Sequence, residues 1–398
     1  MFERKTILRV LDFFCYRLTN ILASLMRIRL RRVADEGGGK RILVIADDRL
    51  GDALVRMPFY AALRKRFPRG SYVISIVVAR PVDQLFARMP FFDEIIVEDA
   101  TALHSILWFF NGKFKVRRLL KWSRARKVDI LVNLVRMRAL GYDYVRRMLA
   151  PRVSIAYSED GLAALYPMTG AYQRRRETSC YTHVVPFRND MAQTEDLKLF
   201  LRLAAGSDAE FEPVPRDLWA KFLDVDGGKG GTGKPIVLVP GSNMPYRRWP
   251  EGRFRELAAA LLEKFPDAEI VVAGTAGERP LGDAVAAASP GRIRNLCGKT
   301  GLVELGRLLL GARLVVSNET GTATYAAVVG APTVVVLGGG DFGVFFPAPF
   351  YRNTASAFSK RECFNCGWRC RECDLQRQTA PCIGDVSVAE VLSAALSL

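Results

Sequence analysis

The chain has 398 residues, more than one hydrophobic core normally organises, so two domains are expected. Hydrophobic residues make up 49% and charged residues 25%, which excludes a disordered chain, a collagen-like fibre and a polytopic membrane protein. Lys and Arg number 58 against 41 for Asp and Glu, a net charge of +17, and nearly all of this excess lies in residues 1–200. The first half is therefore expected to face an anionic partner, such as nucleic acid, a phosphorylated substrate or an acidic membrane surface.

Residues 1–39 predict a basic amphipathic helix, because apolar residues recur every three or four positions among many Arg and Lys. Asp12 and Arg17 leave the apolar run too short and too charged to cross a bilayer, and no signal-peptide cleavage site follows. The helix either packs on its own domain or lies in an anionic membrane interface, and its charge favours the interface. Residues 105–127 mix aromatic and basic side chains, which suits a lipid headgroup region and an ordinary helix face equally well.

The rest of the chain alternates apolar strands with helices. Strands are expected at 41–46, 72–79, 94–98, 129–134, 154–157, 235–240, 269–273, 313–317 and 332–337, and helices at 51–67, 252–265 and 302–310 among others. Continuous apolar strands separated by helices predict parallel sheets that are covered on both faces. We therefore expect an α/β protein with an N-terminal Rossmann-like domain at 40–223, a Gly-rich linker at 224–234 and a C-terminal Rossmann-like domain at 235–398.

Polar motifs follow three of these strands, where ligands of such sheets bind. The first is Asp47-Asp-Arg-Leu-Gly-Asp52, which lacks the G-x-G-x-x-G of nicotinamide and flavin dehydrogenases and places Asp52 at a helix start. The second, Pro240-Gly-Ser-Asn243 with Arg247-Arg-Trp-Pro250, joins small residues that a diphosphate can approach to a basic pair that can neutralise it. The third, Ser317-Asn-Glu-Thr-Gly-Thr322, presents hydroxyls and backbone amides to an anion or a ribose.

Together these motifs resemble glycosyltransferase family 9, the heptosyltransferase family that builds the lipopolysaccharide core, over about residues 40–395. The similarity includes Leu296-Cys-Gly-Lys-Thr300 and the Ala326-Ala327…Gly330-Ala331-Pro332 segment. It implies the GT-B fold, in which two Rossmann-like domains face a cleft. The first domain would bind the acceptor and the second a nucleotide-sugar donor.

The resemblance also implies roles for single residues. Asp52 matches the base of an inverting transfer, which takes the proton of the attacking acceptor hydroxyl. The positions that match donor-binding residues are Ser242, Asn243, Arg247, Arg248, Glu278, Glu319, Thr320, Gly321 and Thr324. At three of them the chain departs from the usual family residue: Arg247 replaces Lys, Glu319 replaces Asp and Thr324 replaces His. Basic residues of the first half are expected to bind an anionic acceptor, namely Arg49, Arg56, Lys113, Arg117 and Arg118.

Five cysteines lie close together near the C-terminus, at Cys363, Cys366, Cys370, Cys373 and Cys382. Two C-x-x-C pairs can supply thiolate ligands to a structural zinc or iron ion. The resemblance implies Cys363, Cys366, Cys370 and Cys382 as ligands, with Cys373 as an extra thiol. The alternative is a group of free or paired thiols without metal. A catalytic metal is not expected, because the cluster has no His or open carboxylate.

The resemblance implies an inverting glycosyltransferase, and the basic N-terminal helix favours a location that is cytoplasmic and peripheral on the cytoplasmic face of the bacterial inner membrane. The enzyme would transfer a sugar, expected to be a heptose from ADP-heptose, to the lipopolysaccharide core or a similar anionic glycolipid. No nucleic-acid partner is expected, since nothing matches a known recognition motif. Three alternatives remain: an autotransporter-type protein heptosyltransferase, a nucleic-acid-binding module and a non-catalytic family member.

Overall fold

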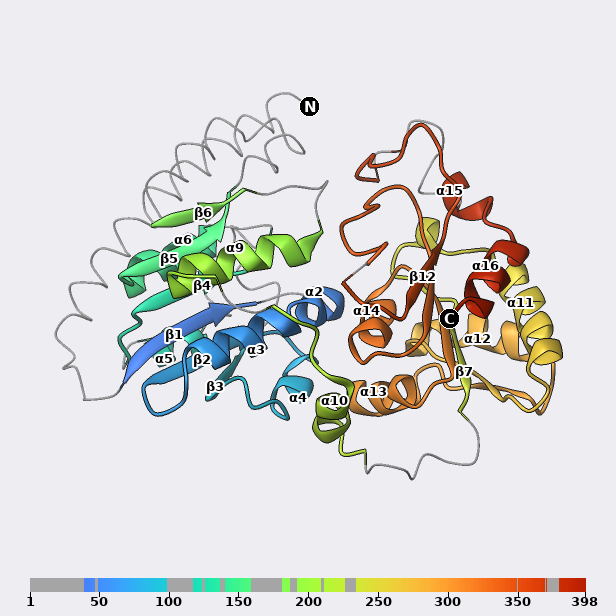
Figure 1. The fold of residues 1–398 in the computed structure, drawn as a ribbon, viewed down its shortest axis with the longest axis horizontal. Coiled ribbons are helices and arrows are strands. Elements are labelled where there is room, and N and C mark those ends of the chain that lie inside the picture. The colour runs from blue at the N-terminus through green and yellow to red at the C-terminus, as the bar shows by residue number, and fades with distance from the viewer. Residues whose placement is uncertain are drawn as a thin grey trace. The chain divides into compact units, whose positions relative to one another are not determined.

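The computed structural model describes most of the chain (Figure 1). The described residues are 39–46, 49–98, 117–123, 126–136, 140–158, 181–186, 192–208, 211–225, 234–348, 350–368, 370 and 379–398. The predicted N-terminal amphipathic helix and most of the predicted linker lie outside these ranges. Within them, no helix combines the length and the apolar character needed to cross a membrane.

The chain forms two compact units. The first comprises residues 1–48, 59–188 and 196–210, and the second comprises Arg49–Pro58, Asn189–Glu195 and Phe211–Leu398. Two short segments that are surrounded in sequence by the first unit therefore belong to the second. One of them carries the predicted base, Asp52.

The first unit contains a parallel six-stranded sheet in the order β3-β2-β1-β4-β5-β6. Its strands are β1 (Lys40–Ile45), β2 (Tyr72–Val78), β3 (Glu94–Val97), β4 (Ile130–Asn133), β5 (Val153–Tyr157) and β6 (His183–Val185). Helices α3 (Met57–Arg66), α4 (Asp83–Phe86), α5 (Arg117–Ser123), α6 (Leu140–Leu149) and α9 (Gln193–Ala205) connect them or flank them in sequence, and α3 and α9 begin within the second unit. Ile42 of β1 lies opposite both Ile74 and Ile130 and is fully buried, as expected for a central parallel strand.

The second unit contains another parallel six-stranded sheet, in the order β12-β11-β10-β7-β8-β9. Its strands are β7 (Ile236–Val239), β8 (Ile270–Val272), β9 (Ile293–Asn295), β10 (Leu314–Asn318), β11 (Thr333–Val336) and β12 (Thr354–Ala357). Its helices are α2 (Leu50–Val55), α10 (Arg216–Phe222), α11 (Glu251–Lys264), α12 (Arg279–Ala286), α13 (Leu302–Leu310), α14 (Gly321–Val328), α15 (Pro381–Gly384) and α16 (Val388–Leu396), with short 3-10 turns η2 (Pro245–Arg247) and η3 (Ala276–Glu278). The prediction of two parallel α/β sheets is confirmed.

The direction of strand addition reverses once in each sheet, beside β1 in the first and between β7 and β10 in the second. Ligands of open α/β sheets bind outside the carboxyl ends of the strands at such a reversal. The loops that follow β7 and β10 therefore flank the expected ligand position of the second unit. All of the predicted donor-binding motifs lie on or beside these loops.

The third and longest segment of the second unit begins at Phe211, upstream of the predicted linker at 224–234. Helix α10 explains the difference, because its Trp219 ring packs against Tyr325 of α14 at 6.1 Å between centroids. Arg216 also donates hydrogen bonds to the carbonyl oxygens of Val329 and Gly330. The packing of α10, rather than the Gly-rich composition that follows it, sets this division.

Candidate functional site

Asn318 holds the loops after β7 and β10 against each other. It is fully buried at the end of β10, where its amide nitrogen donates to the Pro240 carbonyl oxygen at 2.8 Å. Its amide oxygen accepts from the backbone N–H of Trp249 at 2.9 Å. Because both ends of the amide are used, the two loops have a fixed mutual position. The second and third sequence motifs are thereby brought to one edge of the sheet.

Arg248 maintains the shape of the loop after β7. Its Nε and Nη2 atoms both donate to the Ser242 carbonyl oxygen, at 2.9 and 2.7 Å. The Ser242 hydroxyl accepts from the backbone N–H of Met244 at 3.4 Å, and the Ser242 side chain is buried, whereas Asn243 is exposed. The guanidinium of Arg248 is therefore occupied by the loop itself. The roles of these residues in donor binding remain predictions.

Arg247 lies in a cluster with Asp341 and Trp368, which the sequence motifs did not predict. Its Nη2 atom donates to Oδ2 of Asp341 at 2.9 Å, and its guanidinium lies 4.2 Å from the ring centroid of Trp368. The Trp368 indole N–H donates to the same Asp341 oxygen at 2.7 Å. The Nε atom of Arg247 is buried and has no hydrogen-bond partner among the described residues. The cation is thus held in place while part of its donor capacity is unused.

Glu319 is a buried carboxyl beside this cluster. Both of its oxygens are inaccessible to solvent, and neither has a hydrogen-bond partner in the described part of the chain. Burial raises the pKa of Glu319 to about 8, the charge on Arg247 lowers it and the charge on Asp341 raises it. Glu319 is therefore mostly protonated at neutral pH, so it can donate as well as accept a hydrogen bond.

Asp52 lies in the first turn of α2, which packs against α14 within the second unit. The two helices meet at Gly51 and Gly321, where a Cβ atom on Gly51 would lie 3.3 Å from the Gly321 Cα. This close approach explains why both positions are glycine. It places the turn that carries Asp52 directly against the start of α14, which follows Glu319 and Thr320.

Thr320 and Thr324 belong to the first turns of α14. The Thr320 hydroxyl caps the helix by accepting from the Ala323 backbone N–H at 3.4 Å. The Thr324 side chain is buried, and its hydroxyl donates to the Thr320 carbonyl oxygen at 3.5 Å. Both hydroxyls therefore already serve the helix. Their contacts with a donor, like that of Gly321, remain predictions.

Glu278 lies in a capping box at η3. Its Oε2 atom accepts from the Thr275 backbone N–H at 2.7 Å and from the Thr275 hydroxyl at 2.9 Å. The same carboxylate lies against Gly241, where a side chain would collide with it. The structure thus places Glu278 beside the loop after β7 and gives it a structural task there, and its role in donor binding remains a prediction.

The predicted acceptor-binding residues are described only in part. Arg49 and Arg56 flank α2, and Arg49 is exposed whereas Arg56 is fully buried. Lys113 lies outside the described residues, and Arg117 and Arg118 are described only as backbone positions of α5. Only Arg49 and Arg56 have described side chains, so the acceptor-binding role of all five residues remains a prediction.

Cys382 lies at the start of α15, where its sulfur accepts from the Gly339 backbone N–H at 3.4 Å. Burial raises the pKa of this thiol, and the charges of Cys366 and Cys370 raise it further, so these sulfurs share one neighbourhood. Across the described ranges, no three His, Cys, Asp or Glu side chains form a group that could hold a metal ion. Cys373 lies outside those ranges, and the predicted zinc or iron remains a prediction.

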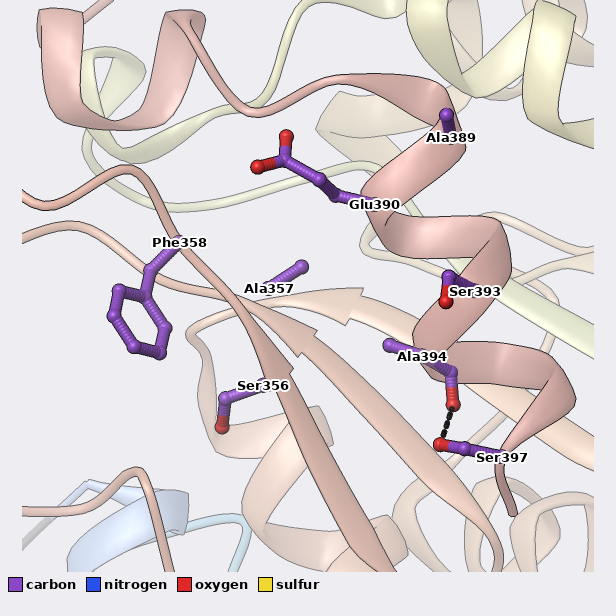
Figure 2. Close-up of a pocket in the computed structure, with 8 residues that line it drawn as sticks. All are labelled: Ser356, Ala357, Phe358, Ala389, Glu390, Ser393, Ala394 and Ser397. Atoms are coloured by element: carbon purple, nitrogen blue, oxygen red, sulfur yellow. Dashed lines mark hydrogen bonds between the residues drawn. The ribbon is translucent and has the colours of Figure 1, made fainter.

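A separate open pocket of about 540 Å³ lies between the end of β12 and α16 (Figure 2). It is lined by Ser356, Ala357, Phe358, Ala389, Glu390, Ser393, Ala394 and Ser397. The Glu390 carboxylate is engaged with the N–H and the hydroxyl of Ser387, both at 2.7 Å, in the capping box of α16. The remaining lining residues are mostly small and uncharged, so this pocket has no evident chemical function.

Asp341 and Trp368 are the site residues that the motifs did not reveal. Asp341 follows Gly338-Gly339-Gly340 at the end of β11, which is the kind of strand end that carried the other motifs. Trp368 lies between two of the cysteines, where the metal-ligand spacing drew attention to sulfur alone. The triple glycine was the available signal, because it marks a close approach to the backbone.

Comparison with known proteins identifies similar families and folds. Residues 190–370 match the sequence model of glycosyltransferase family 9 (heptosyltransferase). Lipooligosaccharide heptosyltransferase 2 of Haemophilus influenzae is 32% identical over 111 residues, which cover 26% of this chain and only 32% of that relative. Lipopolysaccharide heptosyltransferase 3 of Escherichia coli is 22% identical over 299 residues, which cover 73% of this chain and 81% of that protein.

Two solved structures share the fold. A family 9 glycosyltransferase from Veillonella parvula has a TM-score of 0.62 at 19% identity, with 90% of this chain and 96% of that chain covered. The ADP-heptose lipopolysaccharide heptosyltransferase II of Escherichia coli has a TM-score of 0.59 at 17% identity, with 90% and 98% covered. At such identities the likeness establishes the arrangement of each parallel-sheet unit, and no substrate.

Proposed function

Because this chain belongs to glycosyltransferase family 9, we propose that it is an inverting glycosyltransferase of lipopolysaccharide biosynthesis. It transfers a heptose from ADP-heptose, or from a related nucleotide-diphosphate sugar, to the lipopolysaccharide core or a similar anionic glycolipid. The names of the similar proteins support this class of donor and acceptor. The structural observation that carries the proposal is that Arg247 and Glu319 both have buried polar atoms without hydrogen-bond partners among the described residues.

Buried polar atoms in folded proteins nearly always have hydrogen-bond partners. The Nε atom of Arg247 and both oxygens of Glu319 are exceptions among the described residues. A cation with free donors suits a diphosphate, whereas a neutral carboxyl suits the hydroxyl groups of a sugar. One ligand that contains both groups, a nucleotide-diphosphate sugar, would satisfy both residues.

In the proposed reaction, the Asp52 carboxylate takes the proton of an acceptor hydroxyl while that oxygen bonds to the anomeric carbon of the donor. The bond from this carbon to the diphosphate oxygen breaks on the opposite side, which inverts the configuration. The nucleoside diphosphate leaves with the negative charge, which Arg247 and the N-terminus of α14 stabilise. The contact between Gly51 and Gly321 supports this assignment, because it holds the Asp52 turn against α14.

We further propose that the basic first half binds the anionic acceptor at the cytoplasmic face of the inner membrane. The net charge of +17 supports a peripheral location, since cationic segments near anionic lipids gain roughly 1 kcal/mol per basic residue. A structural zinc or iron ion is also proposed, because the two C-x-x-C pairs can supply thiolate ligands, and the resemblance to family 9 implies that Cys363, Cys366, Cys370 and Cys382 hold it. Metal analysis of the purified protein, with Cys382→Ser as the comparison, tests it.

Calorimetric titration with ADP, GDP, UDP and CMP tests the donor site. We expect selective binding of one nucleotide, reduced roughly 10- to 100-fold in Arg247→Ala because a charged hydrogen bond to phosphate is lost. Arg313→Ala is the matched control. Arg313 also lies over an aromatic ring, at 4.2 Å from the Phe265 centroid, and pairs with Asp267 at 3.5 Å. Absence of binding to all four nucleotides would contradict the proposed function.

Transfer of heptose to a lipopolysaccharide acceptor tests the base. Asp52→Asn should abolish turnover while nucleotide affinity persists, because the amide cannot take a proton. Asp217→Asn serves as the control, since Asp217 is also acidic, lies in the first turn of a short helix and is exposed. Near-normal turnover in Asp52→Asn would remove Asp52 from the mechanism.

A further inference from the structure

The cysteine-rich segment is attached to the loop that ends β11. The backbone N–H of Asn365 donates to the Gly339 carbonyl oxygen at 2.6 Å, and that of Gly367 donates to the Gly340 carbonyl oxygen at 2.9 Å. The Phe364 ring adds to the attachment by packing 5.1 Å from Phe342 between centroids. The segment is therefore fixed to this loop by its backbone and by its side chains.

The Trp368 ring lies directly against Gly338 and Gly340 of the triple glycine. A Cβ atom on Gly338 would lie 2.5 Å from the Trp368 ring, and one on Gly340 would lie closer still. The backbone of Trp368 has φ of 59°, in the left-handed region that a bulky residue adopts only where its surroundings determine it. Gly338, Gly340 and an unfavourable backbone conformation thus place this indole against the loop, while Gly339 leaves room for the Phe364 ring of the same segment.

The indole placed in this way acts on Arg247 directly, through its ring, and indirectly, through Asp341. Its ring face lies 4.2 Å from the guanidinium, and its N–H fixes Oδ2 of Asp341, which in turn accepts from Arg247 Nη2. Stacking and a shared carboxylate restrict the rotamers of a long, flexible side chain. The Nε atom, which has no partner among the described residues, then has a defined direction.

We propose that Trp368 is a positioning residue for the donor site: it holds Arg247, through ring stacking and through Asp341, in the orientation that receives the phosphates of the donor. This inference rests on the proposed function. It gives the cysteine-rich segment a task at the site, because this segment carries Trp368. A pre-oriented cation binds phosphate more tightly, since less side-chain freedom is lost on binding.

A double-mutant cycle tests the proposal, with the affinity for whichever of ADP, GDP, UDP and CMP the wild type binds as the readout. Trp368→Leu should weaken binding roughly 10- to 100-fold, because stacking and the indole hydrogen bond are both lost. Trp368→Phe keeps a ring over the loop and should lose only about 3- to 10-fold. In the Arg247→Ala background either substitution should have almost no further effect, since Trp368 acts through Arg247.

Trp122→Phe is the matched control. The Trp122 indole also donates to a carboxylate, Glu94, at 2.8 Å and also lies beside an arginine, Arg126, but in the first unit. It should leave nucleotide affinity unchanged. Two results would overturn the positioning role while the proposed function stands. In the first, the losses of nucleotide affinity add in the double mutants. In the second, Trp368→Phe and Trp368→Leu keep full affinity although Arg247→Ala is impaired. A wild type that binds no nucleotide would contradict both the positioning role and the proposed function.

Thermal unfolding of each variant accompanies the titrations. If Trp368→Leu does not fold, the cycle with Trp368→Phe decides, because a phenyl ring still fills the space above Gly340.

Discussion

Each unit contains a cluster of tryptophan, arginine and carboxylate, and the two clusters differ in how completely their polar atoms are paired. In the first unit, Oε2 of Glu94 accepts from the indole N–H of Trp122 at 2.8 Å, the hydroxyl of Ser75 at 2.8 Å and Nη1 of Arg41 at 3.0 Å. Arg126 pairs with the other oxygen at 3.4 Å. Four donors therefore surround this carboxylate, and its hydrogen-bonding capacity is used within the unit.

The cluster of the second unit uses similar side chains and leaves some of their capacity unused. Asp341 is paired with Trp368 and Arg247, but Arg247 Nε and both oxygens of Glu319 have no partners in the described ranges. The pKa values follow the same contrast. Burial alone would raise the pKa of Glu94, but hydrogen bonds and two arginines lower it overall, whereas burial raises that of Glu319 to about 8. The paired cluster stabilises its unit, and the incomplete one is suited to a ligand.

Exchange of each carboxyl for its amide should have opposite effects on stability. Glu94→Gln should lower the free energy of unfolding by about 1–3 kcal/mol, because an amide NH₂ would face donors. Glu319→Gln should raise it at pH 7 by an amount on the order of 1–3 kcal/mol, since the wild type must take up a proton at Glu319 when it folds. Urea unfolding measures both. A loss of stability in Glu319→Gln as large as that in Glu94→Gln would show that Glu319 is ionised and paired.

The same contrast predicts opposite responses to pH. The folded-state pKa of Glu319 is raised above its ordinary value of 4.5, so its contribution to stability is complete below that value and is lost as pH rises toward 8. The pKa of Glu94 is lowered, so its contribution is present above the ordinary value and is lost in more acidic solution. Unfolding curves of the wild type and each Gln variant between pH 3 and 9 should therefore diverge in opposite directions. Parallel curves for wild type and Glu319→Gln would contradict the assignment.

Sequence patterns predicted the central strands well and the edges poorly. β1, β2, β7 and β10 are apolar runs that are buried on both faces, and such runs are visible in a sequence. Of the four edge strands only β3 was predicted. β6, β9 and β12 were missed, because two three-residue strands with exposed positions and a strand of small residues show no apolar run. The helix expected at 51–67 is divided at Arg56 into α2 and α3, and this break was also not evident.

The candidate site combines residues that the sequence motifs singled out with residues that only tertiary packing brings to them. Arg247 and Glu319 lie in strand-end motifs, whose position at a sheet edge follows from the alternation of strands and helices. Asp341 and Trp368 join them only because three glycines let a distant segment approach the loop after β11. Such a tertiary contact has no local signature, and neither does the unpaired state of Glu319, which depends on every residue around it.

Proton uptake on nucleotide binding is the smallest expected effect, and it is the most specific test of the difference between the paired Glu94 and the unpaired Glu319. A diphosphate beside Glu319 should raise its pKa further, because a nearby negative charge disfavours ionisation. At pH 8, where the free site is only partly protonated, binding should therefore take up a fraction of a proton and weaken as the pH increases. Calorimetry in two buffers with different ionisation enthalpies measures this uptake. Glu319→Gln should abolish this proton uptake, because the amide does not titrate. Glu94→Gln should preserve it, since Glu94 lies in the fully paired cluster of the first unit.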